Sequence, residues 1–228
     1  MRCGIVGTNF ISEWLIADAR RTGGLIEPVS VYSRSQERAE QFAAAHGLAA
    51  AFSDFAAMVD SVDVVYVASP TYAHFAQAMQ AIEAGKHVIV EKTMTQNVEE
   101  AEALFNAAVR RGVVVMEATR NLHAPAQQVI RDALGTLGTI RYVHCEKQQY
   151  SSRYDRVRAG ETLNAFDPTL GNSAIADIGV YCLEPVLDLF GVPGRSCGAS
   201  VRLANGFEAA GSLQLAYDSM LVDVTYSK

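Results

Sequence analysis

Residues 1–120 alternate short apolar runs with segments of helical periodicity, and this alternation constrains the fold more than any other feature of the chain. The run VDVVYVA at residues 62–68 is almost wholly apolar, as expected of a strand buried on both faces of a parallel sheet. Six such strands with helices between them predict a complete doubly wound nucleotide-binding fold of the Rossmann type. The predicted strands cover residues 2–6, 28–32, 49–52, 62–68, 87–90 and 113–116.

The pattern changes after Pro125. Helices are predicted over 126–134 and 174–190, with strands over 139–149, 197–204, 208–217 and 220–226. Asn205-Gly206 lies between two of these strands and is a strong hairpin signal. We therefore predict an α/β chain with two domains. A Rossmann domain over 1–120 carries a doubly wound parallel sheet, and an α+β domain over 121–228, for substrate binding or oligomerisation, has a mainly antiparallel open sheet.

Composition excludes several classes of partner. The net charge is −6 with no basic block, so bulk electrostatics attract neither nucleic acid nor anionic membrane. No apolar run reaches the roughly 20 residues of a membrane span, and the chain enters a strand directly, so no signal peptide is expected. The four cysteines form no C-x-x-C pair, which favours free thiols in a reducing cytoplasm. No metal site is predicted.

The stretch GIVGTNFIS, residues 4–12, reads as a phosphate-binding turn between a strand and a helix. Such a turn presents free N–H groups at the positive end of a helix. Gly7 permits a tight turn, but Asn9 replaces the usual second glycine of G-x-G-x-x-G and Ser12 replaces the third. Asn9 tolerates positive φ, and its side chain would crowd the phosphates or donate to them. The alternative is a purely structural turn; the βαβ context favours nucleotide binding.

The second predicted strand ends in VYSRSQER rather than in the acidic residue that usually accepts from the ribose of NAD. Ser33 and Arg34 suit a 2′-phosphate, and Arg38 lies one helical turn further on. The alternative is a solvated charge cluster at a helix start. The pattern favours NADP, with NAD as the second choice.

Four further motifs are SPTYAH (69–74), GKHVIVEKT (85–93), MEATRNLHAP (116–125) and GNSAIADIGVY (171–181). In order and spacing, the chain resembles over its whole length the Gfo/Idh/MocA oxidoreductases, the group of glucose–fructose oxidoreductase and inositol dehydrogenase. The Glu91-Lys92 pair and the D-x-G-x-Y segment are the most specific parts. Tyrosine at the end of the last motif resembles the branch that includes the dimeric dihydrodiol dehydrogenases. The resemblance implies a dehydrogenase or reductase acting on CH–OH groups of a sugar, polyol or cyclic diol, and a homo-oligomer.

Lys92 ends a parallel strand at the edge where open α/β sheets bind ligands, and its ammonium can neutralise charge on a substrate oxygen. Asp177 and Tyr181 stand at i and i+4 and share a helix face, with Gly179 between them allowing close approach by another group. The resemblance points to Tyr181 as the acid/base, and Asp177 is expected to orient substrate hydroxyls. The alternatives are a Lys that simply closes a strand, a core tyrosine and an ordinary aspartate near a helix N-terminus.

The predicted catalytic residues are thus Lys92, Tyr181 and Asp177. The predicted cofactor-binding residues are Gly7, Thr8, Asn9, Phe10, Ile11, Ser33, Arg34, Arg38, Ser69, Pro70, Thr71, His74, Glu91 and Lys92. For His74, packing near the cofactor is favoured over chemistry. Glu117 and Thr119 lie on the same ligand edge.

The chain departs from the family pattern at several points. Thr93 stands where the family often has proline, which is expected to relax the backbone that aims Lys92. Leu122 stands where many relatives carry arginine. Family members usually run on beyond this point to complete the second sheet, so a partial or shortened chain is expected. A nucleotide-binding sensor without turnover is the alternative function, and the retained Lys92, Asp177 and Tyr181 set argues against it.

Overall fold

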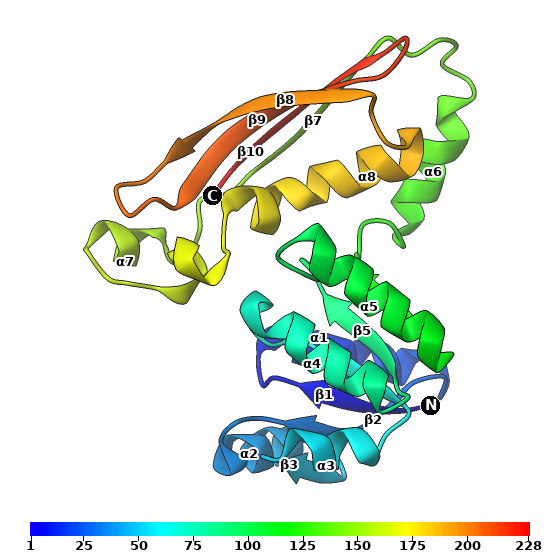
Figure 1. Ribbon diagram of the computed structural model, residues 1–228, viewed down its shortest axis with the longest axis vertical. Coiled ribbons are helices and arrows are strands. Elements are labelled where there is room, and N and C mark those ends of the chain that lie inside the picture. The colour runs from blue at the N-terminus through cyan, green and yellow to red at the C-terminus, as the bar shows by residue number, and fades with distance from the viewer. The chain divides into compact units, whose positions relative to one another are not determined.

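A computed structural model describes residues 1–228, which divide into two compact units, Met1–Ala118 and Thr119–Lys228. The first unit holds a six-stranded parallel sheet in the order β3-β2-β1-β4-β5-β6 (Figure 1). Its strands are β1 (Arg2–Val6), β2 (Glu27–Tyr32), β3 (Ala50–Phe52), β4 (Val64–Val67), β5 (His87–Glu91) and β6 (Val115–Ala118). Its helices are α1 (Phe10–Ala19), α2 (Gln36–His46), α3 (Phe55–Asp60), α4 (His74–Glu83) and α5 (Val98–Arg111). The predicted Rossmann-type fold is confirmed.

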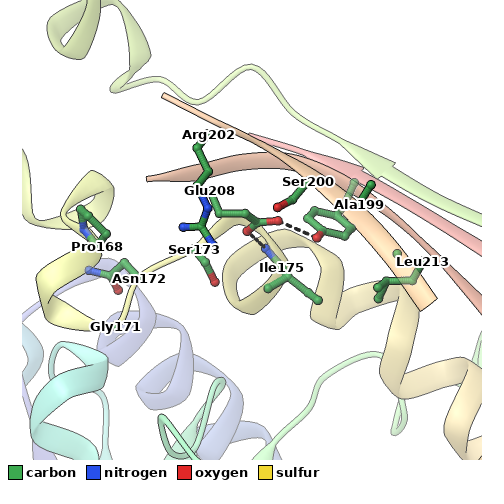
Figure 2. Close-up of a pocket in the computed structure, with 12 residues that line it drawn as sticks. Pro168, Gly171, Asn172, Ser173, Ile175, Ala199, Ser200, Arg202, Glu208 and Leu213 are labelled. Carbon is green, nitrogen blue, oxygen red and sulfur yellow. Dashed lines mark hydrogen bonds between the residues drawn. The ribbon is translucent and has the colours of Figure 1, made fainter. Parts of the chain in front are cut away.

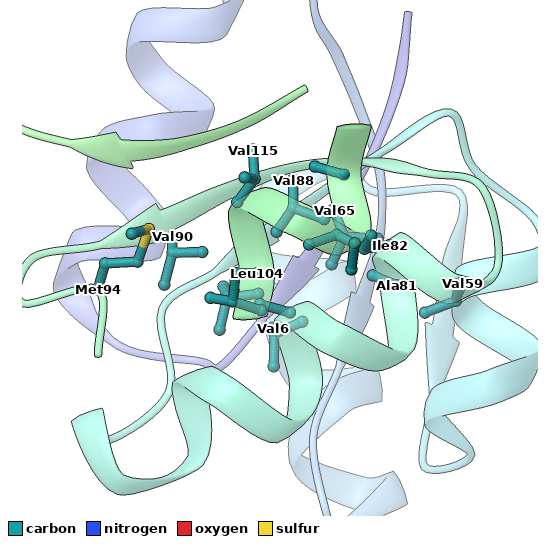
Figure 3. Packing of buried hydrophobic residues seen from close by; sticks show 14 of the residues in the cluster. Val6, Val59, Val65, Ala81, Ile82, Val88, Val90, Met94, Leu104 and Val115 are labelled. Atoms are coloured by element: carbon teal, nitrogen blue, oxygen red, sulfur yellow. The ribbon is translucent and has the colours of Figure 1, made fainter. Parts of the chain in front are cut away.

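Strand β4 shows why its sequence is apolar on both faces. Val65 and Val67 pack into a core with α3, α4 and α5, where Leu104 and Ile82 are fully buried (Figure 3). Tyr66, on the opposite face of the strand, packs with α1 and α2. Burial of each large aliphatic side chain contributes about 1.5–3 kcal/mol, so both helical layers are held firmly to the sheet.

Helix α1 buries a stripe of small and aliphatic side chains against the sheet. The side chains of Phe10 and Trp14 are 53% and 50% exposed and pack edge to face on each other. The buried stripe is Ser12, Ile16 and Ala19. Small residues at both ends of this stripe let the helix approach the sheet closely, which excludes the two aromatic rings from the core.

The second unit contains a four-stranded sheet in the order β7-β10-β9-β8, in which β7 and β10 are parallel and the other pairs antiparallel. Its strands are β7 (Tyr142–Gln148), β8 (Arg195–Arg202), β9 (Glu208–Ala216) and β10 (Leu221–Ser227). Its helices are α6 (Pro125–Leu134), α7 (Tyr154–Arg158), a π-helical segment (Ile175–Gly179) and α8 (Val180–Phe190). The predicted mainly antiparallel sheet is confirmed, and β8 and β9 form the hairpin expected at Asn205-Gly206.

The π-helical segment and α8 cover one face of this sheet. Ile178, Cys182 and Val186 pack against Val222 and Val224 of β10. Gly179 lies directly on the ring of Tyr226, where a Cβ would stand 3.1 Å from Cδ1, so the close approach expected at this glycine is made by a tyrosine of the sheet. None of the helices of the chain combines the length and the apolar character that a membrane crossing requires.

Candidate active site

The turn from β1 into α1 lies at the point where the strand order of the sheet reverses, between β1 and β4. Ligands of open α/β sheets bind in the crevice at this switch point. Gly7 has a φ of +107°, and a Cβ on it would stand 2.8 Å from the carbonyl oxygen of Ala68. Only glycine satisfies both restrictions, so the close turn that the sequence predicts at this position is present.

Asn9 adopts an extended conformation, with φ −113° and ψ 174°, so the tolerance of asparagine for positive φ does not explain its presence. Its side chain caps α1 instead: Oδ1 accepts from the N–H groups of Ile11 at 2.9 Å and Ser12 at 3.2 Å. Its Nδ2 donates to the carbonyl oxygen of Ala68 at 2.7 Å. Asn9 therefore ties the helix start to the end of β4, across the switch point.

This cap leaves part of the anion site in place. The first N–H groups of a helix lack intrahelical partners, and the cap occupies those of Ile11 and Ser12 but not that of Phe10. The Ser12 hydroxyl, fully buried, donates to Gly7 O at 2.9 Å, which closes the turn on itself. The turn thus offers backbone donors at the positive end of α1, where a diphosphate is favoured.

Strand β2 ends beside a cationic surface. Arg34 and Arg38 are exposed, and neither guanidinium forms an ion pair within the chain. The Ser33 hydroxyl accepts from the N–H of Ser35, and the Ser35 side chain caps α2 by accepting from Arg38 N–H. Two guanidiniums without an ion pair and a hydroxyl, all within six residues of the chain at the end of β2, suit a phosphate dianion. Together with the Gly7 turn, these residues fit a dinucleotide that carries a 2′-phosphate.

The segment after β4 contains four of the predicted cofactor residues, Ser69, Pro70, Thr71 and His74. Ser69 Oγ donates to Gln77 Oε1 at 2.6 Å, and Pro70 precedes a short 3-10 turn at Thr71–Ala73. His74 is only 1% exposed, with Nε2 2.7 Å from Ser69 O and Nδ1 3.0 Å from Thr93 O. Burial lowers the pKa of His74, which favours the neutral ring. His74 therefore contacts the backbone that follows β4 and the backbone that follows β5.

Lys92 follows β5 at the same sheet edge, among carboxylates. Glu91 accepts a hydrogen bond from the hydroxyl of the buried Tyr66, and its second oxygen accepts from Lys92 N–H at 3.3 Å. Glu117, at the end of β6, accepts from Met94 N–H at 2.6 Å. Burial raises the pKa of Glu117, and the charge of Glu91 raises it further. The peptide between Lys92 and Thr93 is cis.

In the second unit, Asp177 and Tyr181 lie on one continuous helical stretch, but its first part is not the regular α-helix that the i, i+4 spacing assumed. Asp177 falls in the π-helical segment and Tyr181 in α8. The Asp177 carboxylate pairs with Lys228 Nζ at 2.8 Å. The Lys228 side chain is 8% exposed, and its ammonium also donates to Ala165 O and lies 4.7 Å from the Phe166 ring centroid.

Tyr181 is held at two points. The Lys147 ammonium from β7 lies 5.0 Å from the centroid of its ring, within cation–π range. Pro185, four residues on, has no N–H to donate to the Tyr181 carbonyl, and the Asn121 side chain donates to that carbonyl at 3.4 Å instead. The backbone and the ring of Tyr181 thus have specific partners within the second unit.

The start of the π-helical segment is anchored by a buried carboxylate. Glu208 is 6% exposed; it accepts from Ile175 N–H at 3.0 Å and from the Tyr226 hydroxyl at 2.5 Å (Figure 2). These groups line a cavity of about 520 Å³ between the 168–175 loop and strands β8 and β9. Since Asp177 is two residues beyond Ile175, Glu208 helps to fix where its carboxylate lies.

Sequence reasoning missed Lys228, Lys147 and Glu208 as partners of the predicted residues. Lys147 lies in β7, Glu208 begins β9 and Lys228 directly follows β10, and only strand pairing brings each of them beside the helix. The one available signal was strand alternation: Lys147 lies two residues after Cys145 and therefore on the same face of the predicted strand.

The comparisons with known proteins decide the family. Residues 1–119 match the model of the GFO_IDH_MocA oxidoreductase family, described as an NAD-binding Rossmann fold. The chain is also 40% identical over its whole length to scyllo-inositol 2-dehydrogenase (NADP(+)) IolU of Bacillus subtilis (strain 168), of which it spans 70%. The chain belongs to the Gfo/Idh/MocA oxidoreductase family.

Further relatives of this Gfo/Idh/MocA protein agree. It is 35% identical over its whole length to the uncharacterized oxidoreductase YgjR of Escherichia coli (strain K12), of which it spans 70%. The structure of KijD10, a 3-ketoreductase from Actinomadura kijaniata in complex with NADP and TDP-benzene, matches all of this chain and 69% of KijD10, with 26% identity and a TM-score of 0.87. The predicted family and the prediction of an NAD(P)-dependent oxidoreductase are confirmed.

Proposed function

We propose that this protein is an NADP-dependent dehydrogenase that oxidises a secondary alcohol of a cyclic polyol, or reduces the corresponding carbonyl. The observation that carries the proposal is the 40% identity along the entire chain to an inositol dehydrogenase that uses NADP(+). The unpaired Arg34 and Arg38 beside Ser33 support the choice of cofactor, because they match a 2′-phosphate and no acidic residue competes for the ribose.

The cofactor would be held by the Gly7–Phe10 turn at its diphosphate and by Ser33, Arg34 and Arg38 at its 2′-phosphate. When bound, it supplies a nicotinamide that accepts or gives hydride. Ser69, Pro70 and Thr71 line the same sheet edge beyond β4. Thr8 belongs to the turn itself, and Ile11 lies in the first turn of α1.

The proposal assigns the proton to Tyr181, whose hydroxyl accepts it from the substrate alcohol, or donates it to the carbonyl in the reverse direction. Lys92 stabilises the negative charge that develops on the substrate oxygen, as a preorganised ammonium does most effectively where water is excluded. Asp177, fixed by Lys228 at 2.8 Å, accepts from a neighbouring substrate hydroxyl and so orients the ring. A polyol with adjacent hydroxyls satisfies both carboxylate and phenol.

The proposal also includes the assembly state and location. Every residue of β8 is exposed, and this strand lies at an edge of the second sheet, which favours self-association through that sheet. The second unit would then serve both substrate binding and oligomerisation. Four cysteines without a disulfide favour the cytoplasm.

The test is a cofactor-reduction screen with NADP⁺ and NAD⁺ side by side, against scyllo-inositol, other inositols, linear polyols, sugars and a cyclic diol. We expect nicotinamide reduction with a cyclic polyol, and a higher kcat/KM with NADP⁺. Tight NADP⁺ binding without reduction by any substrate would contradict the proposal and favour the sensor. A preference for NAD⁺ would contradict only the proposed binding of the 2′-phosphate by Arg34 and Arg38, not the proposed reaction.

A further inference from the structure

The three residues after β5, Lys92 to Met94, are held from three sides by ionisable side chains. Lys92 N–H donates to Glu91 Oε2 at 3.3 Å, and Met94 N–H donates to Glu117 Oε1 at 2.6 Å. Between them, the carbonyl oxygen of Thr93 lies 3.0 Å from His74 Nδ1. Successive backbone groups around Lys92 are therefore fixed by side chains, and we call Glu91, His74 and Glu117 the Lys92 clamp.

The clamp joins the ends of three neighbouring strands. Glu91 ends β5, and Glu117 belongs to β6, which pairs with β5. His74 begins α4, and its Nε2 lies 2.7 Å from the carbonyl oxygen of Ser69, just after β4. A neutral ring has one N–H and donates to one of these two carbonyls at a time. The Lys92 segment is thereby tied to the edges of β4 and β6.

Burial makes these contacts consequential. His74 is 1% exposed and Met94 6% exposed, while Glu117 is half-buried. A hydrogen bond away from water is electrostatically stronger than an exposed one, and removing one partner leaves the other buried without a hydrogen bond. Loss of the Glu117 oxygen would leave Met94 N–H in that state, and the segment would shift to find another partner.

The clamp also explains how the backbone at position 93 can be ordered without a proline. The sequence suggested that Thr93 relaxes the backbone aiming Lys92, but here the order of that backbone comes from side chains on neighbouring strands. We propose that Glu117 and His74 are positioning residues that hold the Lys92 backbone and act on the reaction through the placement of the Lys92 ammonium. This inference rests on the catalytic role given to Lys92 in the proposed function.

Glu117 can serve this role without its charge. Its carboxyl is faced by Glu91 and Lys92, and burial raises its pKa. The contact with Met94 N–H needs only an acceptor oxygen, which the side chain of glutamine also provides. Glu117→Gln is therefore expected to retain function, whereas Glu117→Ala is expected to lose it.

The experiment compares kcat and KM of the full chain for Glu117→Ala, Glu117→Gln and His74→Phe, with the exposed Glu99→Ala as matched control. Displacing a catalytic group by about 1 Å costs up to about 100-fold in rate, so we expect kcat to fall about 10- to 100-fold in Glu117→Ala and His74→Phe. We expect the NADP⁺ KM of Glu117→Ala to stay within a factor of about 2, and Glu117→Gln and Glu99→Ala to match wild type. Trp14 fluorescence confirms that each variant is folded.

A second readout does not depend on turnover: the rate at which an amine reagent labels Lys92, followed by mass spectrometry with Lys86 as internal reference. We expect Glu117→Ala to change labelling at Lys92 but not at Lys86. Unchanged kcat and unchanged Lys92 labelling in both loss variants would overturn the clamp, as would a Glu117→Gln defect equal to that of Glu117→Ala. Lys92→Met distinguishes the proposed function from the clamp. Wild-type turnover in this variant refutes the catalytic role of Lys92 itself. An inactive Lys92→Met variant, together with fully active Glu117→Ala and His74→Phe variants, refutes only the clamp.

Discussion

Replacing Asn9 tests whether the unusual residue of the phosphate turn is a structural cap. Asn9→Ala removes the acceptor for two N–H groups of α1 and the donor to Ala68 O. Loss of an N-cap costs about 1 kcal/mol, and loss of the Ala68 contact about 1 kcal/mol more. We therefore expect the free energy of unfolding of the first unit to fall by about 2 kcal/mol, a factor of about 30 in the equilibrium.

The chain itself provides the assay. Its single tryptophan, Trp14, lies on α1, the helix that Asn9 caps, so urea unfolding followed by tryptophan fluorescence reports on the first unit. Asn9→Ser is the matched variant: serine also caps, so it should lose only the Ala68 contact, about 1 kcal/mol. An Asn9→Ala variant as stable as wild type, or one no less stable than Asn9→Ser, would refute the capping account.

Four further predictions follow from the contacts described. Replacing Arg34 and Arg38 together by alanine should raise the KM for NADP⁺ at least 10-fold and leave that for NAD⁺ nearly unchanged, because only NADP⁺ carries the 2′-phosphate that these guanidiniums meet; equal effects on both cofactors in steady-state kinetics would contradict this. Burial holds the pKa of His74 below its ordinary value of 6.5, so the folded chain binds this proton less readily than the unfolded chain. The free energy of unfolding that His74 contributes is therefore present above pH 6.5 and is lost as the pH falls below it. His74→Gln should flatten the dependence of the free energy of unfolding on pH between about pH 7 and 5, measured by urea titration. Glu208→Ala leaves Ile175 N–H and the Tyr226 hydroxyl without their acceptor and should destabilise the second unit by about 2–4 kcal/mol. Amide hydrogen exchange in the 175–179 segment measures this loss, and protection equal to that of wild type would exclude an anchoring role for Glu208. Native alkylation should label the exposed Cys197 first and Cys3 last, since burial raises the pKa of Cys3 to about 12; rapid loss of the Cys3 thiol by mass spectrometry would argue against the packed β1.

The hydrophobic pattern was sufficient to predict where the strands and most of the helices lie. In the first unit the strands read as apolar runs because helices cover both faces of the parallel sheet. Helix α3 escaped prediction because six residues give too little periodicity, although Asp54 caps it through Ala56 and Ala57. The sequence did not show which face of α1 is buried, because the small residues Ser12 and Ala19 fit against the sheet while the aromatic residues of the helix stay exposed.

At the candidate site, short motifs single out Lys92, Asp177 and Tyr181, and their catalytic roles stay predictions. Their supports were not visible. Glu117 and His74 lie 25 and 18 positions from Lys92, and only the pairing of β4, β5 and β6 brings them to the same edge. Likewise Lys228 reaches Asp177 only through the packing of β10 under the π-helical segment. Residue type suggests which side chains are candidates for chemistry, whereas the order of the strands decides which neighbours hold them.

The central claim is that Lys92 and Tyr181 act on one substrate in NADP-dependent hydride transfer. The most direct measurement is the rate of nicotinamide reduction by wild type, Lys92→Met and Tyr181→Phe, with the best cyclic polyol from the screen and NADP⁺ binding measured in parallel. Removal of an acid–base or charge-stabilising group lowers kcat by about 10²–10⁴-fold. We expect such a loss in each variant with NADP⁺ affinity retained; wild-type turnover in both would contradict the account.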